Sequence, residues 1–345
     1  MRKVLLALLL TALALGTAAS GEKKWRIALS NDYAGNSWRQ SMISDWKKAA
    51  ETAIQKGLIE EAPIFTTNES SAAEQAAQIQ SLIIEGYDAI VLNAASATAL
   101  NSVVQEALDA GIVVVSFDNA ITNENAWRLI TDFEFMGRTQ IEYVGKRFPN
   151  GGSLLEIRGL AGTYVNDAIH KGIVDTLAKY PKLKVVAEVY GDWTASVAQK
   201  AVAGILPSLP EVVGVVTQGG DGYGAVKAFE AAGKPIPLVL MGNRYDELEI
   251  WKELHDKSGY ETISLSIAPG ASTIAFWEAI EVLNGADVPK EIRLLPLVID
   301  TVAKMEKAIK VTPKGGVATI VYSQEWVQQM IANFKAGKLP PPDPE

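Results

Sequence analysis

Short runs of apolar residues alternate with amphipathic stretches along most of the chain from Trp25 onward. The runs carry few polar residues, which is typical of strands that are buried on both faces of a parallel sheet. The stretches between them have the spacing of helices. The expected strands are WRIAL, APIFT, DAIVL, IVVVSF, GSLLEI, KVVAEV, VVGVV, IPLVLM and TISLSI. The expected helices cover 38–56, 71–85, 97–110, 168–178, 195–206, 225–232, 246–254 and 271–283.

This alternation runs in two successive series, which predicts an α/β protein of two doubly wound, Rossmann-like lobes. We expect the boundary between Asn119 and Phe135, because the stretch NAITNEN that begins there is polar and typical of a loop. The tail 336–345 contains KLPPPDPE, which fits neither a helix nor a strand. We therefore expect this tail to be disordered.

The first twenty residues have the layout of a secretory signal peptide. Arg2 and Lys3 precede an apolar run, 4–16, that is short for a membrane span, and small residues follow at 17–20. We expect cleavage after Ala19 or Ser20, with a membrane anchor as the alternative. The chain has no cysteine, so we expect a periplasmic protein that is not a lipoprotein.

The amino-acid composition excludes some classes of binding partner. Lys and Arg number 32 against 40 Asp and Glu, for a formal net charge of −8, and no basic stripe is present. Such a chain is a poor candidate for binding nucleic acid. No spacing of His, Asp or Glu suggests a metal site, so we expect no metal.

One loop has the glycine spacing of a dinucleotide-binding site. In VVTQGGDGYGAVKAF, Gly220, Gly222 and Ala225 fit G-x-G-x-x-A. Such a site also needs an acidic residue about 20 positions on, at the end of the next strand. Asn243 stands there instead. We therefore expect no cofactor, and we expect the glycines to let the loop approach a ligand closely.

Polar side chains follow most of the apolar runs. Ligands of open parallel sheets bind beyond the carboxyl ends of the strands, so these positions are candidates for a site. Any single one can also be a turn former or a helix N-cap. The residues at these ends are Ser30, Asn31, Asp32, Asn93, Asp118, Asn119, Arg158, Asp192, Trp193, Gln218, Asp221 and Asn243.

Carboxylates, amides and aromatic rings together suit a sugar or polyol. A carboxylate accepts hydrogen bonds from neighbouring hydroxyls, and an amide both donates and accepts. Trp38 and Trp193 follow strand ends, one in each lobe, where their rings can cover apolar C–H faces. For Trp38 a core position is the alternative, since Met42 lies one helical turn away.

The stretch IALSNDYAGNSWRQSMISDWKKAAE resembles the sugar-binding periplasmic proteins of ABC importers, the ribose/galactose family with the type I fold. The similarity continues through EQAAQIQSLIIEGYDAIVLNAAS, ALDAGIVVVSFDNAI, GLAGT and LPEVVGVVTQGGDGYGAVKAFEAAG. This resemblance implies two lobes joined by three crossovers, near Thr131, Ser266 and Val298. It implies an N-terminal lobe of 25–131 plus 267–297 and a C-terminal lobe of 132–266 plus 298–335.

The resemblance also implies ligand-binding residues. Asn36, Trp38 and Arg39 fall in the family's first ligand loop, and the Trp-Arg pair is similar to that of galactofuranose-binding relatives. Asn243 stands where most relatives have Asp, Lys171 where ribose-binding relatives have Arg, and Ser266 begins SIAP where Gln usually precedes the hinge Pro. The complete expected set is Asn36, Trp38, Arg39, Asn93, Asp118, Asn166, Lys171, Trp193, Asp221, Asn243 and Ser266.

The expected function is capture of a monosaccharide or sugar alcohol by a monomer that delivers it to an ABC permease, and a chemoreceptor is a further possible partner. One alternative is a carbohydrate-active enzyme, with Asp118 and Asp221 as a carboxylate pair. His170 and His255 are the only histidines, and both fall in expected helices. A second alternative is a sugar-sensing transcription regulator, although a secretory signal stands where its DNA-binding helices belong.

Overall fold

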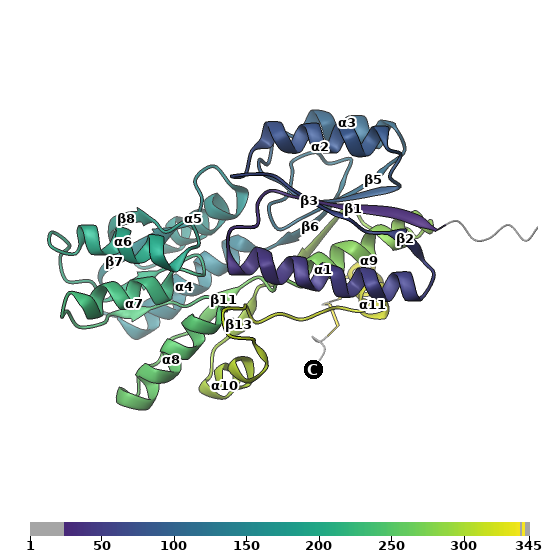
Figure 1. Ribbon diagram of the computed structural model, residues 1–345. Coiled ribbons are helices and arrows are strands. Elements are labelled where there is room, and N and C mark those ends of the chain that lie inside the picture. Colours follow the sequence, from purple (N-terminus) through teal and green to yellow (C-terminus); the bar gives the residue numbers. More distant parts are fainter. Residues whose placement is uncertain (1–23, 339, 342–345) are drawn as a thin grey trace, which may run out of the picture.

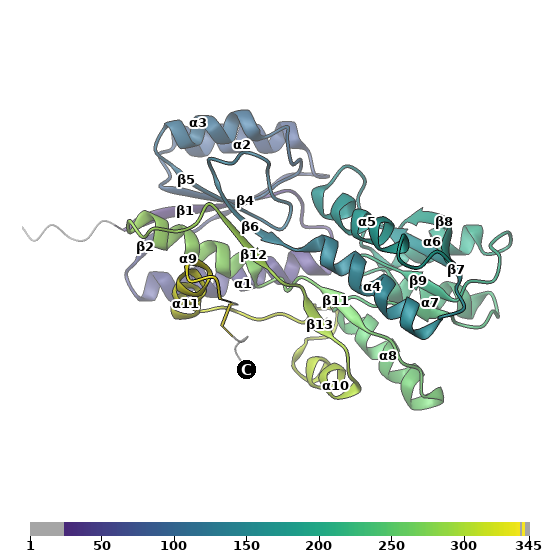
Figure 2. The same ribbon diagram turned by 180° about the vertical axis from the view of Figure 1, so that it is seen from behind.

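The computed structural model describes residues 24–338 and 340–341, and these form two α/β lobes (Figures 1 and 2). The predicted signal peptide and residues 339 and 342–345 of the expected tail lie outside the described residues. Within the described part of the chain, no helix is both long enough and apolar enough to span a membrane.

The N-terminal lobe is built on a parallel sheet that contains the first expected series of strands. Its elements are β1 (Trp25–Asn31), α1 (Ser37–Gln55), β2 (Ile59–Glu61), β3 (Ile64–Thr66), α2 (Ala72–Ile84), β4 (Ala89–Asn93), α3 (Asn101–Asp109), β5 (Val113–Phe117), β6 (Trp127–Thr131), α9 (Ala271–Leu283), β12 (Glu291–Leu294) and α11 (Gln324–Lys335). The strand order is β12-β6-β5-β4-β1-β2, and β3 also pairs with β1. Helices α2 and α3 cover one face, and α1, α9 and α11 cover the other (Figure 1).

The C-terminal lobe repeats this plan with a smaller sheet. Its elements are α4 (Phe133–Arg147), β7 (Gly152–Arg158), α5 (Tyr164–Leu177), β8 (Leu183–Tyr190), α6 (Ala195–Ile205), β9 (Gly214–Val216), α7 (Gly222–Ala231), β10 (Leu238–Val239), α8 (Tyr245–Ser258) and α10 (Val302–Val311). The parallel strand order is β10-β9-β7-β8. Helices α4 and α5 pack on one face of this sheet, α6 and α7 pack on the other, and α8 packs against α10.

A small antiparallel ribbon lies where the lobes meet, formed by β11 (Ser264–Ser266) and β13 (Leu297–Ile299) (Figure 2). The chain passes between the lobes near Thr131, Ser266 and Val298. A fourth passage follows α10, because Val317 and the residues of α11 pack in the core of the N-terminal lobe. The expected assignment of 298–335 to the C-terminal lobe therefore does not hold for α11, whose Val327, Met330 and Ile331 are buried there.

The expected strands and helices all occur, with shifted ends, and several additional elements were not predicted. Helix α4 is the longest of these. Its Gly137 lets α5 approach so closely that an added Cβ would lie 2.2 Å from the carbonyl oxygen of Ile169. On α5, a Cβ added at Gly172 would lie 2.2 Å from the carbonyl oxygen of Glu134. The buried face of α4 carries Phe133, Met136, Ile141 and Val144, but Gly137, Gln140 and Gly145 interrupt this apolar stripe and weaken the helical signal in the sequence. The remaining unpredicted elements are β2, β6, β12, β13, α10 and α11.

Helix α9 is buried on all sides, between the sheet and its neighbours α1 and α11, and its Glu278 places a fully buried carboxyl group in this core. The Glu278 side chain has no hydrogen-bond partner for either oxygen among the described residues. Burial raises the pKa of Glu278 to about 8. The unfolded chain releases this proton near the usual pKa of about 4.3, so between those two values the folded state binds more protons than the unfolded state.

We predict that this group makes the protein less stable as pH rises. Between about pH 5 and pH 8 the free energy of unfolding should fall for the wild type relative to Glu278→Gln, by at most about 1.4 kcal/mol per pH unit. Below about pH 5 the free energies of unfolding of the two proteins should change with pH in nearly the same way. Urea denaturation at several pH values measures the difference, and parallel curves from pH 5 to 8 would contradict the prediction.

Candidate functional site

The polar strand ends of both lobes meet at one cleft between the lobes. Its free space is about 510 Å³, including the part open to solvent. The N-terminal lobe contributes Asn36, Trp38, Arg39, Asp118 and Val317 to its lining, and Ser266 and Ile267 come from the hinge. The C-terminal lobe contributes Phe133, Met136, Val165, Ile169, Trp193, Gln218, Gly219, Gly220, Asn243 and Arg244.

A buried ionic network forms the N-terminal wall of the cleft. The guanidinium of Arg39 donates from Nε to Asp32 Oδ1 at 2.9 Å and from Nη2 to Asp32 Oδ2 at 3.1 Å, which is bidentate geometry. Its Nη1 donates to Asp118 Oδ2 at 2.8 Å. All three residues are at most 4% exposed. Burial raises the pKa of the Asp118 carboxyl, and the charge of Arg39 opposes that rise.

Local structure places each member of this network. Arg39 lies in the first turn of α1, where Asn36 is the N-cap and accepts the backbone N–H of Arg39 at 2.9 Å. Asp32 follows β1 and also accepts a hydrogen bond from Ser70 Oγ at 3.1 Å. Asp118 follows β5 with a φ of 57°, a left-handed conformation that Asp tolerates better than most residues.

Asp118 keeps part of its hydrogen-bonding capacity. Its contacts with Arg39 and with Asn93 Nδ2, the latter at 3.4 Å, both use Oδ2. Oδ1 has no hydrogen-bond partner among the described residues. Because Asp118 lines the cleft, this oxygen is available to accept hydrogen bonds from a ligand.

Each lobe also contributes a fixed tryptophan. The Trp38 indole Nε1 donates to the carbonyl oxygen of Ile267 at 2.9 Å, and the Arg39 guanidinium lies 4.8 Å from the ring centroid. Trp193 lies against the backbone of Gly159, where an added Cβ would come within 2.1 Å of the indole Nε1. Both rings are therefore held in place before any ligand binds, with 7% and 8% of each residue exposed.

The C-terminal wall is mainly apolar. Helix α4 supplies Phe133 and Met136, and α5 supplies Val165 and Ile169. The polar residues of this wall are Gln218, Asn243 and Arg244. Asn243 Oδ1 accepts a hydrogen bond from Ser264, and its buried Nδ2 has no partner among the described residues. The cleft is thus polar on the N-terminal side and apolar on much of the other.

The glycine loop that resembled a dinucleotide site is already occupied by a carboxylate of the same chain. Glu247 of α8 accepts the backbone N–H groups of Gly220, Gly222 and Gly242 at 2.9, 3.0 and 2.9 Å. Phosphate-binding loops use such N–H groups to hold their ligand. In this loop the three N–H groups donate to Glu247 instead.

The family model of the periplasmic binding protein domain matches residues 27–287, which include most of both lobes and most of the cleft residues. The chain belongs to this family. The type I periplasmic binding protein fold and the resemblance that we expected from the sequence are both confirmed.

The relatives of this periplasmic binding protein are solute-binding proteins. An ABC transporter solute-binding protein from Thermobispora bispora DSM 43833 is 35% identical with a TM-score of 0.87, and the match covers 93% of this chain and 99% of that one. The xylitol-binding protein of Mycolicibacterium smegmatis is 29% identical over 216 residues, which are 61% of each chain. The galactofuranose-binding protein of Escherichia coli is 26% identical over 252 residues, 69% of this chain and 78% of that protein.

The structure brings most of the expected site residues together. Asn36, Trp38, Arg39, Asp118, Trp193, Asn243 and Ser266 line the cleft. Asn93 lies directly behind Asp118, in contact with its carboxylate.

Besides Asn93, three expected residues lie outside the cleft lining, each for a physical reason. Lys171 is on an exposed face of α5, where its ammonium pairs with Glu134 and Asp175 at 3.1 and 2.8 Å. Asn166 is buried, and its carbonyl oxygen accepts a hydrogen bond from Gln218 Nε2 at 3.0 Å. Asp221 is also fully buried, and burial raises its pKa well above the usual range while Arg244 opposes the shift.

The apolar wall was missed by sequence reasoning. Phe133, Met136, Val165 and Ile169 are mostly buried apolar residues on helices, and in a sequence such residues cannot be distinguished from core residues. Gln218 and Arg244 carried a signal, since both follow expected strands, but they were not included in the expected set.

We predict that Arg39 is essential for the stability of the N-terminal lobe. Arg39→Met should lower the free energy of unfolding by about 3–5 kcal/mol, because two buried carboxylates would lose their counter-charge. Arg138→Met is the control, since Arg138 pairs with Asp132 only at the surface, at 3.6 Å, and should change stability by at most about 1 kcal/mol. Urea denaturation measures both variants, and equal losses would contradict the prediction.

Proposed function

We propose that this protein is an extracytoplasmic solute-binding protein that captures a monosaccharide or sugar alcohol and delivers it to an ABC permease. The observation that carries the proposal is the cleft itself, which joins the polar strand ends of one lobe to tryptophan and apolar side chains of the other. A ligand that contacts both lobes stabilises the closed arrangement more than the open one, which is how binding drives hinge closure.

A neutral polyhydroxylated ligand fits the chemistry of the two walls. Asp118 Oδ1 offers an acceptor, and Asn243 Nδ2 offers a donor. The charge of Arg39 is already matched by Asp32 and Asp118. On the other wall, Arg244 lies near the carboxyl groups of Asp221 and Glu247, where burial raises the pKa of each and the charge of Arg244 opposes that rise. Neither guanidinium is therefore without nearby acidic groups. The apolar wall around Phe133 suits the C–H face of a sugar or polyol.

The named ligands of relatives support the same chemical class. The curated relatives are named for xylitol, ribose and galactofuranose. They support a sugar or polyol for this chain, while the identity of the ligand must come from experiment. The solute-binding protein from Thermobispora bispora supports the role in transport over nearly the full length of both chains.

The alternative of a carbohydrate-active enzyme required Asp118 and Asp221 to face one ligand as a pair of carboxylates. Glycoside hydrolysis requires two carboxyl groups about 5–10 Å apart on either side of the scissile bond. Asp118 lines the cleft, but Asp221 is buried outside the lining, so the expected carboxylate pair is not presented to a ligand. The described relatives are likewise named as binding proteins.

We predict that a thermal-shift screen of sugars, polyols, sugar acids and amino acids will select one small class of neutral monosaccharides or polyols. For that ligand, calorimetry should show at least tenfold weaker binding for Asp118→Asn, which removes a charged acceptor worth roughly 1.5–3 kcal/mol. Phe133→Ala should also weaken binding, because the ligand contacts the other lobe as well.

Lys171→Ala is the matched control, because Lys171 lies outside the cleft and pairs only with surface carboxylates. Its affinity should equal that of the wild type. A melting temperature raised only by amino acids would contradict the carbohydrate class. Turnover of a sugar by the purified protein would contradict the binding role.

A further inference from the structure

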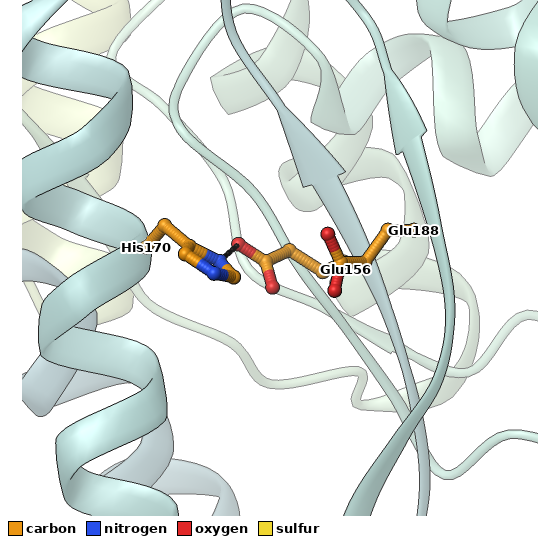
Figure 3. A group of neighbouring side chains, drawn as sticks. All are labelled: Glu156, His170 and Glu188. Carbon is orange, nitrogen blue, oxygen red and sulfur yellow. Dashed lines mark hydrogen bonds and ion pairs between the residues drawn. The ribbon is translucent and has the colours of Figure 1, made fainter.

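A second group of polar side chains lies in the C-terminal lobe, and none of its members lines the cleft. Glu156 on β7, His170 on α5 and Glu188 on β8 each offer one ligand atom, and these atoms all lie within 4.8 Å of one another (Figure 3). Their placement follows from the sheet register, because Glu156 and Glu188 are direct partners in the parallel pairing of β7 with β8. His170 reaches them from the helix packed on the same face.

The middle residue of this group is buried and only partly satisfied. Glu156 is 1% exposed, and its Oε1 contacts His170 Nδ1 at 2.8 Å. Its Oε2 is also buried and has no hydrogen-bond partner among the described residues. A buried carboxylate oxygen without a partner is costly, so this atom is suited to bind a ligand.

The local charge balance favours a cation. Two carboxylates lie beside one histidine, and Arg158 is the nearby positive group, with its Nη1 3.6 Å from Glu188 Oε2. Arg158 is shared with Asp167, which its Nη2 contacts at 3.4 Å. A divalent ion would offset the two carboxylates and would give Glu156 Oε2 a partner.

We propose that Glu156, His170 and Glu188 form a binding site for a divalent transition-metal ion, for which zinc is the best match. Mixed imidazole and carboxylate ligands suit zinc, whereas calcium and magnesium prefer oxygen ligands alone. Zinc with three protein ligands keeps a fourth position for water, and this site opens to solvent on the side of the half-exposed Glu188. The three ligand atoms must rearrange to reach zinc–ligand distances of about 2.0–2.2 Å. The half-exposed Glu188 side chain at the sheet edge, held among the described residues only by a 3.6 Å contact with Arg158, can make that movement.

The ion would fasten α5 to the sheet of the C-terminal lobe. Helix α5 also carries Val165 and Ile169 of the cleft wall, so the same helix serves both sites. The metal proposal stands apart from the proposed function, since it uses none of the residues assigned to ligand binding. Sequence spacing gave no sign of it, because its ligands come from three elements that the fold brings together.

The test is calorimetric titration of untagged, chelator-treated protein with zinc chloride, with calcium chloride as a parallel arm. The chain contains two histidines and no cysteine, which makes the assignment of a zinc site unusually direct. We expect one zinc per chain. His170→Asn and Glu188→Gln should each weaken zinc binding at least tenfold, and zinc should raise the melting temperature of the wild type but not of His170→Asn.

Two control variants leave the site intact. His255→Asn removes the other histidine, whose Nδ1 contacts the carbonyl oxygen of Tyr260 at 3.3 Å, and Asp175→Asn removes a surface carboxylate from the same helix as His170. Both should bind zinc as the wild type does. The proposal is overturned if no zinc binds at 100-fold excess, if His170→Asn binds zinc like the wild type, or if calcium binds as tightly as zinc.

Discussion

A guanidinium and two carboxylates lie together out of water at the N-terminal wall of the cleft, and burial makes each of these charges costly without the others. Arg39 satisfies Asp32 in bidentate geometry and Asp118 through a third N–H group, so the loops after β1 and β5 are joined to the first turn of α1. That connection determines where Asp118 and Trp38 face the cleft. The network thus serves the stability of the lobe and the shape of the site at once.

In the C-terminal lobe, a buried carboxylate likewise holds the loops that line the cleft. Glu247 collects the N–H groups of the glycine loop and of Gly242, and this holds the loop that carries Gly219 and Gly220 at the cleft. Gln218 bridges Gly159 N and the carbonyl oxygen of Asn166. Both lobes therefore present preformed surfaces, which lowers the ordering cost of capturing a small ligand.

Much of this could be predicted from the sequence. Buried parallel strands consist almost entirely of apolar residues, so β1, β4, β5 and β7 were visible, and the polar residues at their ends marked the edge where a ligand binds. Helix α4 was missed because Gly137, Gln140 and Gly145 interrupt the apolar residues of its buried face. The position of α11 on the N-terminal lobe also depends on contacts with α9 that are distant in sequence.

Some residues of the site could be predicted from the neighbouring sequence, whereas others depend on contacts between segments that are distant in the sequence. Asp118 and Asn243 were visible because strand ends carry a local signal, whereas the apolar wall at Phe133 and Ile169 resembles any buried helix face. Lys171 was misplaced because a residue matched to a relative's position need not point into the cleft when surface carboxylates pair with it. The proximity of Glu156 and Glu188 depends on sheet register, and that of His170 on the packing of α5, neither of which the sequence alone provides.

The central claim is that one small ligand lies between the lobes and contacts both. A crystal structure of the protein with the ligand selected by screening tests it most directly. The account predicts ligand density within hydrogen-bonding distance of the Asp118 carboxylate and in contact with Trp193 or Phe133 across the cleft. Density that touches only one lobe, or that lies away from Arg39 and Asp118, would contradict it.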